Sequence, residues 1–97
     1  MRTVIWNKLA KEDFYENIEY LLTDWSERDA QTFIDEVYEI EYLLKNGIID
    51  FQETNKSGVR RCVVCRQITL FYRIYDNNKI EFLRFWNNYR DSEKLLY

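Results

Sequence analysis

The sequence predicts an α+β fold: an N-terminal strand, an antiparallel helical hairpin packed on an antiparallel β-sheet (order β-α-α-β-β-β), and a short C-terminal tail. Three observations lead to this prediction. Two segments in the first half of the chain carry apolar residues at helical spacing, and three segments in the second half are rich in β-branched and aromatic residues. Polar clusters separate these segments, and no linker or internal repeat divides the 97 residues, so we expect a single domain over residues 1–97.

A short strand and a long helix open the chain. Thr3–Trp6 are mostly β-branched residues, which are typical of a strand, and Asn7 is a favoured residue for capping a helix start. The helix is expected to run to about Trp25. Its apolar positions follow one helical face: Phe14, Ile18, Leu21, Leu22 and Trp25.

A second helix is predicted to begin directly afterwards. Ser26, with Asp29 three residues later, can cap it, and Asn46-Gly47 is a typical stop. Its apolar face comprises Ala30, Phe33, Val37, Ile40 and Leu44. Because the connection between the two helices is so short, they should form an antiparallel hairpin.

The second half of the chain resembles a β-meander that follows a loop over residues 48–57. Strands are expected at Val59–Cys65, Ile68–Tyr75 and Ile80–Trp86. Between the last two, residues 76–79 include two asparagines, which tolerate the positive φ that tight hairpin turns require. The middle strand has apolar or aromatic residues on both sides, so we expect the helices to cover one face and leave the other half-covered and free to bind.

Composition limits the chemistry that is available. The chain has no histidine, which excludes the commonest general base, histidine-dependent nucleophiles and mixed histidine zinc sites. Cys62 and Cys65 have the spacing of a redox or metal motif, but residues three apart on a strand point to opposite faces, which favours two ordinary strand cysteines. No cofactor and no metal site are therefore predicted.

Cellular location is inferred from three further features. No apolar run approaches the ~18 residues that span a bilayer, and the N-terminus has no signal-peptide core. Two cysteines without a disulfide framework are typical of a reducing compartment. We therefore expect a cytoplasmic protein with no membrane contact.

Charge is divided unevenly along the chain. Residues 1–49 carry five basic and eleven acidic side chains, a net charge of −6, whereas residues 50–97 carry nine basic and six acidic ones, a net charge of +3. A polyanion is expected to meet the C-terminal half. The arginines of the predicted sheet are either solvent-facing charges or a phosphate-binding surface: Arg60, Arg61, Arg66, Arg73 and Arg84.

Tyr89 and Arg90, just past the last predicted strand, are the other candidate functional residues. The arginine could stabilise developing negative charge, and the tyrosine could stack on a base or transfer a proton. The alternative is structural: Arg90 pairs with Asp50 or a helix carboxylate, and Tyr89 belongs to the core.

Three sequence patterns resemble those of the RelE/ParE superfamily of type II toxin–antitoxin toxins. The first is the opening strand with Trp6 followed by Leu9-Ala10 and Tyr20-Leu21. The second is Gly58-Val59-Arg60 followed by the run from Phe71 to Ile74. The third is the ending from Phe85 to Leu95, which includes Arg90 and Lys94. Their order and spacing extend over nearly the whole chain.

The resemblance implies a growth-inhibiting toxin, of the kind that stabilises plasmids, that a cognate antitoxin neutralises by wrapping the hairpin and sheet. RelE-like members cleave mRNA on the ribosome with basic sheet residues, an arginine past the last strand and a C-terminal tyrosine. Arg60 and Arg90 match two of these positions, Tyr89 or Tyr97 is the candidate tyrosine, and Thr69 and Cys62 stand where RelE has further basic residues. The resemblance thus assigns Arg60, Arg90 and Tyr89 as catalytic candidates.

Three functions follow from the resemblance. ParE-like members inhibit DNA gyrase by binding, without a catalytic set, and the long hairpin favours this interpretation. The alternatives are a RelE-like ribosome-dependent endoribonuclease and a degenerate, non-toxic antitoxin-binding module. A homodimer is a further possible assembly.

Overall fold

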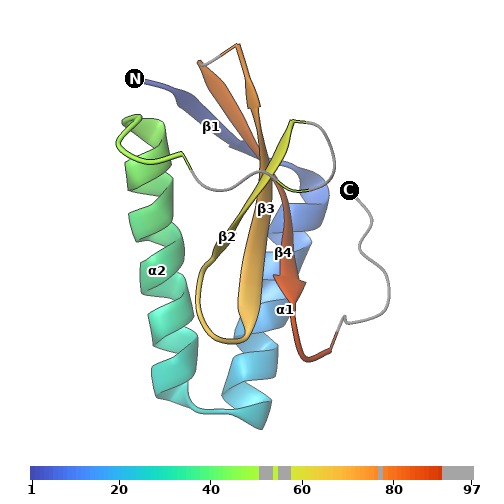
Figure 1. Ribbon diagram of the computed structural model, residues 1–97. Coiled ribbons are helices and arrows are strands. Elements are labelled where there is room, and N and C mark those ends of the chain that lie inside the picture. Colours follow the sequence, from blue (N-terminus) through green and yellow to red (C-terminus); the bar gives the residue numbers. More distant parts are fainter. Residues whose placement is uncertain (51–53, 55–57, 77, 91–97) are drawn as a thin grey trace.

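The structure, a computed structural model, describes residues 1–50, 54, 58–76 and 78–90. The chain forms six elements (Figure 1): β1 (Thr3–Trp6), α1 (Lys8–Asp24), α2 (Glu27–Lys45), β2 (Val59–Val63), β3 (Ile68–Tyr75) and β4 (Lys79–Asn87). The predicted order β-α-α-β-β-β is confirmed. Within the described ranges, neither helix is long and apolar enough to cross a membrane.

Both helices begin at the capping residues that the sequence predicts. The Asn7 side chain accepts a hydrogen bond from the backbone N–H of Ala10 at 2.8 Å, and Ser26 Oγ accepts one from the N–H of Asp29 at 3.1 Å. These contacts satisfy amides that a helix start leaves without an intrahelical partner. Gly47 follows the end of α2 with a φ of +66°, the left-handed conformation that commonly terminates helices.

The buried face of α1 differs from the predicted one. Leu22 and Trp25, which the spacing places on the apolar face, are 49% and 37% exposed, whereas Asp13 and Asn17 are buried. The difference arises because α1 uses these two polar side chains to bond strand β4. The helix therefore presents a mixed polar and apolar face to the sheet.

The sheet is mixed, which corrects the prediction of an antiparallel sheet. Its strand order is β1-β4-β3-β2; β1 runs parallel to β4, and the other neighbours are antiparallel. The cause is topological. The hairpin returns the chain to the end where β1 started, and the meander then reverses direction twice, so β4 runs in the same direction as β1.

Strand β2 ends two residues earlier than predicted. After Val63 the backbone turns, with the N–H groups of Val64 and Cys65 both directed at the carbonyl oxygen of Ile68. At the other hairpin the positive φ of +50° falls on Asp76; Asn77 lies outside the described residues. The two hairpins of the meander are otherwise where the sequence predicts them.

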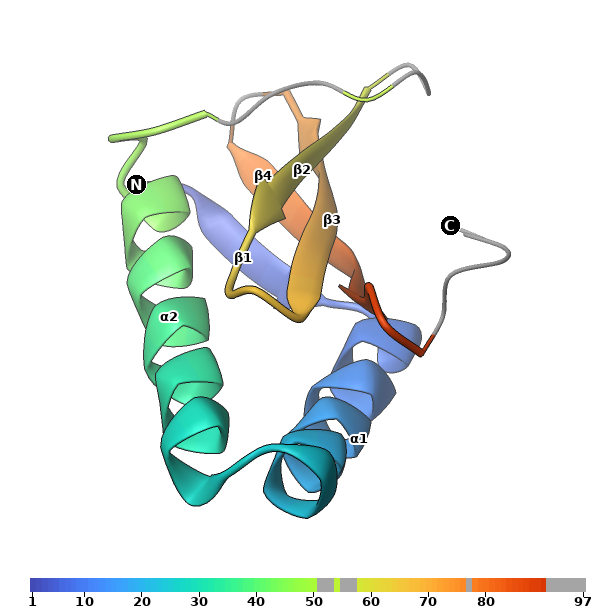
Figure 2. The ribbon, with the colours of Figure 1, turned by 60° about the horizontal axis from the view of Figure 1, so that its bottom comes forward.

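Two apolar clusters lie on the two sides of the sheet. The larger one packs between the helices and the sheet and includes the fully buried Phe33, Tyr72 and Phe82. The smaller one consists of Val59, Phe71 and Leu83, with Trp86 against it. Figure 2 shows the two helices diverging from their short connection, with the sheet lying across their open side.

Candidate functional site

A buried polar network joins α1 to the end of β4. Asp13 Oδ2 accepts hydrogen bonds from Arg84 Nε at 2.7 Å and from the Phe85 N–H at 3.0 Å. One helical turn later, Asn17 Nδ2 donates to the Phe85 carbonyl at 2.9 Å, and Asn17 Oδ1 accepts from Asn87 Nδ2 at 3.2 Å. Buried polar groups must be paired to be tolerated, so this network fixes the register between helix and strand.

Asn87 also fixes the turn that follows β4. Its Oδ1 accepts hydrogen bonds from the N–H groups of Tyr89 at 2.9 Å and Arg90 at 2.8 Å. An asparagine that bonds the backbone two and three residues ahead defines the conformation of that segment. The positions of Tyr89 and Arg90 are therefore determined from inside the core, through Asn87 and Asn17.

An exposed group of aromatic and arginine side chains lies at this end of the molecule. We call it the tip cluster: Tyr20, Trp25, Arg66, Tyr89 and Arg90. Arg66 Nε donates to the Tyr89 hydroxyl at 3.1 Å, and its guanidinium carbon lies 5.5 Å from the centroid of the Trp25 ring. The rings of Trp25 and Tyr89 are 5.6 Å apart. The cluster thus combines the α1–α2 connection, the β2–β3 turn and the segment after β4.

Arg90 leans against α1. Its guanidinium lies 5.9 Å from the centroid of the Tyr20 ring and 3.7 Å from a carboxylate oxygen of Glu16. Arg90 was expected to pair with either Asp50 or a helix carboxylate if its role were structural. It lies beside the helix carboxylate of Glu16, whereas Asp50 pairs with Arg2 at 2.7 Å. Tyr89 is half exposed and does not belong to the core.

Arg60 lies apart from the other two candidates. It stands opposite Tyr72 on β3, whereas the Tyr89 turn begins beyond the pair of Ile68 and Asn87. Tyr72 and Ile68 are separated by about 13 Å along the strand. The structure brings Tyr89 and Arg90 together but places Arg60 at another part of the sheet; Tyr97 lies outside the described residues.

Arg60 lies close enough to Asp50 for its charge to affect the carboxyl. The pKa of the Asp50 carboxyl is lowered, chiefly by its hydrogen bond to Arg2 and in small part by the charge of Arg60. Arg84, another sheet arginine, is held by Asp13 in the buried network. Thr69 donates its hydroxyl hydrogen to Asn88 at 3.1 Å.

The two cysteines are free thiols in apolar surroundings. Cys62 is buried, and burial raises its pKa to about 12; burial also raises the pKa of Cys65. Cys65 follows the end of β2, so the strand-alternation argument applies only to Cys62, and both side chains contact the main core. In the described part of the chain, no group of three or more Cys, Asp or Glu side chains could hold a metal ion.

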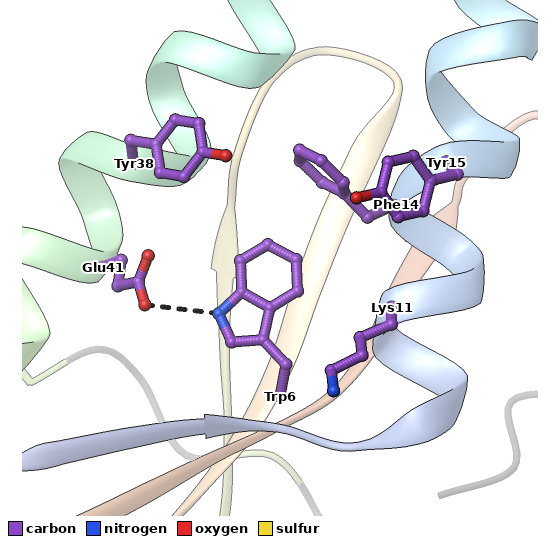
Figure 3. A pocket seen from close by; sticks show the side chains of 6 residues that line it. All are labelled: Trp6, Lys11, Phe14, Tyr15, Tyr38 and Glu41. Carbon is purple, nitrogen blue, oxygen red and sulfur yellow. Dashed lines mark hydrogen bonds between the residues drawn. The ribbon is translucent and has the colours of Figure 1, made fainter.

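A recess of about 290 Å³ opens between the two helices (Figure 3). Its lining consists of Trp6, Lys11, Phe14, Tyr15, Tyr38 and Glu41. Trp6 Nε1 donates to a carboxylate oxygen of Glu41 at 3.3 Å. Tyr15 and Tyr38 stand on opposite walls and are 69% and 56% exposed. No pattern in the sequence predicted this recess.

The sequence contains only weak signals for the residues that it failed to predict. Asp13 and Asn17 are spaced as one helical face, but so are the solvent-facing acidic residues beside them. Asn87-Asn88 indicates a turn without indicating which asparagine is buried. Arg66 was named among the arginines of the predicted sheet, but it and Trp25 belong to connections between elements, and nothing in the sequence places either of them beside Tyr89.

Comparisons with known proteins place these features in a family context. A family model described as "ParE toxin of type II toxin-antitoxin system, parDE" matches residues 4–91. Among solved structures, the chromosomal ParDE toxin–antitoxin system from P. aeruginosa superposes with a TM-score of 0.71 at 17% identity, covering 90% of this chain and 96% of that one. No curated protein matches the chain.

Two further solved structures share the fold. The E. coli DinJ-YafQ complex gives a TM-score of 0.62 at 13% identity and covers 92% of this chain and 96% of the matched one. The YoeB dimer from Staphylococcus aureus gives 0.57 at 12% identity, covering 87% and 93%. At these identities the likeness shows the fold alone.

Proposed function

The chain belongs to the ParE family of type II toxin–antitoxin toxins, and from that premise we propose that it inhibits a protein target such as DNA gyrase by binding and is neutralised by a cognate antitoxin. The structural neighbours include toxin–antitoxin complexes, which supports an antitoxin as partner. We place this activity in the cytoplasm, in keeping with the free thiols.

The observation that carries the proposal is the separation of the catalytic candidates. Arg60 lies about 13 Å or more along the sheet from the turn that holds Tyr89 and Arg90. A composite phosphate-cleaving site requires its groups within contact distance of the same reacting atoms. Arg90 is in addition engaged with Glu16, a carboxylate that would repel a phosphate. Binding without catalysis is the function that this arrangement favours.

The composition of the tip cluster supports a protein target. Tryptophan, tyrosine and arginine dominate binding energy at protein interfaces. Trp25, Arg66 and Tyr89 hold one another through a hydrogen bond and ring contacts, so little side-chain freedom remains to be lost on binding. We therefore assign the tip cluster as the surface that contacts the target.

The test is a gyrase supercoiling assay with purified toxin. Trp25→Ala and Tyr89→Ala should each raise the toxin concentration for half-inhibition by roughly thirtyfold or more, as expected for interface hot spots. Val63→Ala, at a 71% exposed apolar position on β2, is the control and should inhibit like the unmodified protein. Supercoiling that proceeds normally with the unmodified protein present would remove gyrase as the target.

The RelE-like ribonuclease is the second candidate, because the strands β2, β3 and β4 carry a net charge of +4. In a purified translation system this function requires the protein to cut mRNA and Arg90→Ala to abolish the cut. Intact mRNA with the unmodified protein excludes it. Unaffected growth on induction, together with both negative assays, would leave the non-toxic antitoxin-binding module.

A further inference from the structure

The recess between α1 and α2 has a tryptophan ring as its floor, and the structure holds that ring in place. Trp6 meets Phe14 edge to face, with ring centroids 5.1 Å apart and 84° between the ring planes, and its indole N–H donates to Glu41. Figure 3 shows the indole nearly face-on, between the walls that the two helices form. Because the face of an indole attracts cations more strongly than any other aromatic side chain, the floor favours a positively charged ligand.

Three oxygen atoms at the recess can accept hydrogen bonds from such a ligand. The hydroxyl groups of Tyr15 and Tyr38 point toward the space between the helices (Figure 3), and within the described ranges neither takes part in a hydrogen bond. Glu41 accepts the indole N–H through Oε2, and its Oε1 has no donor in the same part of the chain. A ligand that carries several N–H groups can donate to these oxygens, whereas an apolar ligand cannot.

The lining carries one charge of each sign, and the two charges lie apart. Figure 3 shows Lys11 on the α1 side of Trp6 and Glu41 on the α2 side. Among the residues that the structure describes, no carboxylate forms an ion pair with Lys11 and no cationic side chain forms one with Glu41. The Glu41 carboxylate is therefore not neutralised by the protein, and a cation bound on the Trp6 ring would supply its counter-charge.

Further carboxylates flank the recess along both helices. Residues three or four positions apart share a helical face, so Glu12 and Glu19 lie on the face of α1 that carries Tyr15. Asp35 lies in the same way on the face of α2 that carries Tyr38. All three carboxylates are exposed, and the net charge is −3 on α1 and −4 on α2. A ligand with a second amino group a few bonds from the first meets another carboxylate, which favours more than one positive charge.

We propose that this recess binds a linear aliphatic diamine or polyamine. Its volume of about 290 Å³ is at the lower limit of small-molecule sites and admits a short alkyl chain with amino groups. One ammonium group lies on the Trp6 ring and donates to the oxygens of Tyr38 and Glu41, and the next reaches a flanking carboxylate such as Asp35. This binding activity goes beyond the proposed function and does not rest on it, because the recess shares no residue with the tip cluster.

Three ligands of similar length and different charge test the proposal at pH 7 on the full chain: 1,4-diaminobutane, butylamine and 1,4-butanediol. The NMR signal of the Trp6 indole N–H, assigned with Trp6→Phe, reports binding. Diaminobutane should shift this signal at the lowest concentration, butylamine at a concentration several times higher, and the uncharged butanediol not at all in the same range. No shift with diaminobutane, or an equal response to butanediol, would overturn the proposal.

Three conservative variants then test the assigned contacts. Tyr38→Phe removes only the hydroxyl, and Glu41→Gln removes the charge while keeping an acceptor for the indole N–H, so each should weaken diaminobutane binding severalfold. Lys11→Met removes the positive charge of the lining and should strengthen binding severalfold, which a merely structural role of Lys11 would not do. Unchanged affinity in all three variants would contradict the proposed site.

Matched controls on α2 separate the recess from diffuse attraction to the acidic helices. Tyr42 is 59% exposed and lies outside the lining, and Glu36 is close enough to Cys65 for its charge to affect that thiol. Tyr42→Phe and Glu36→Gln should therefore bind diaminobutane like the unmodified protein. If Glu36→Gln weakens binding as much as Glu41→Gln does, the diamine is held by the acidic layer as a whole and the proposal is wrong. Circular dichroism checks that every variant is folded.

Discussion

At the scale of single residues, Asn87 connects the buried interior with the exposed tip cluster. Its two side-chain atoms bond Asn17 on one side and the N–H groups of Tyr89 and Arg90 on the other. Asn87→Ala should therefore cost about 1–3 kcal/mol, since it leaves the Asn17 oxygen unsatisfied in the core. Urea unfolding measures this cost. The exposed neighbour Asn88 is the control, and an equal loss in Asn88→Ala would contradict the assigned role.

Cys62 shows the effect of burial on a single thiol. Because its pKa is raised to about 12, only about one thiol in ten thousand is ionised at pH 8, and the thiolate is the reactive form. In the Cys65→Ser variant, the remaining thiol should react very slowly with Ellman's reagent in the folded protein and rapidly in 6 M guanidinium. Rapid stoichiometric reaction of the folded variant would show that Cys62 is accessible and ionised.

At the scale of elements, α1 and β4 are joined by the ion pair between Asp13 and Arg84, whose side chains are 7% and 18% exposed. Asp13→Ala removes the carboxylate partner of the Arg84 guanidinium and the acceptor of the Phe85 N–H. We therefore expect the free energy of unfolding to fall by about 3–5 kcal/mol. Adding Arg84→Met should recover part of that loss, because an apolar side chain can replace a buried charge. Thermal and urea unfolding of both variants measure the difference; a double variant no more stable than Asp13→Ala would contradict this account.

Local signals predicted the elements well, and long-range contacts determined what the sequence could not predict. Asn7 and Ser26 act on amides within three residues, so their roles as caps could be inferred from neighbouring residues alone. Asp13 acts on a strand 71 residues later, and the helical pattern around it indicates nothing about that partner. The parallel pairing of β1 with β4 is equally non-local, which is why the prediction of an antiparallel sheet was wrong in this one pair.

The candidate site also depends on contacts between residues that are far apart in the sequence. Tyr89 and Arg90 were identified because they follow a strand directly. Their partners Trp25 and Arg66 come from two other connections that only the folded chain brings together. Arg60 was included because of the family resemblance. Its separation from Arg90 in the sequence does not indicate that the two residues lie at different parts of the sheet.

At the scale of the whole molecule, charge is distributed by layer. The helices form an acidic layer and strands β2–β4 a basic one. Two partners of opposite charge can therefore be recognised by opposite sides of one small chain. Such a distribution favours binding to proteins on the helical layer and disfavours nucleic acid there, in agreement with the proposed function.

The residue before β1 is held to the chain after α2 by an ion pair whose strength depends on pH. Arg2 Nη1 lies 2.7 Å from Asp50 Oδ1, and Arg2 also donates its backbone N–H to the Lys45 carbonyl. The pKa of Asp50 is lowered from its ordinary value of 3.8, first by the hydrogen bond to Arg2. Its contribution to stability is thus fully present above about pH 4 and is lost as pH falls through the lower folded pKa.

Asp50→Asn should consequently be less stable than the unmodified protein at pH 6, and the difference between the two should be smaller at pH 2, because the contribution of the ion pair is lost as the pH falls through the lowered pKa of Asp50. The difference at pH 6 should be at most about 1 kcal/mol, because the Asp50 side chain is 41% exposed and solvent screens the pair. Urea unfolding at the two pH values measures it. Arg2→Gln removes the other partner of the pair. Its difference in stability from the unmodified protein should likewise be smaller at pH 2 than at pH 6. A difference that stays constant from pH 6 to pH 2 in both variants would show that the ion pair does not hold these segments together.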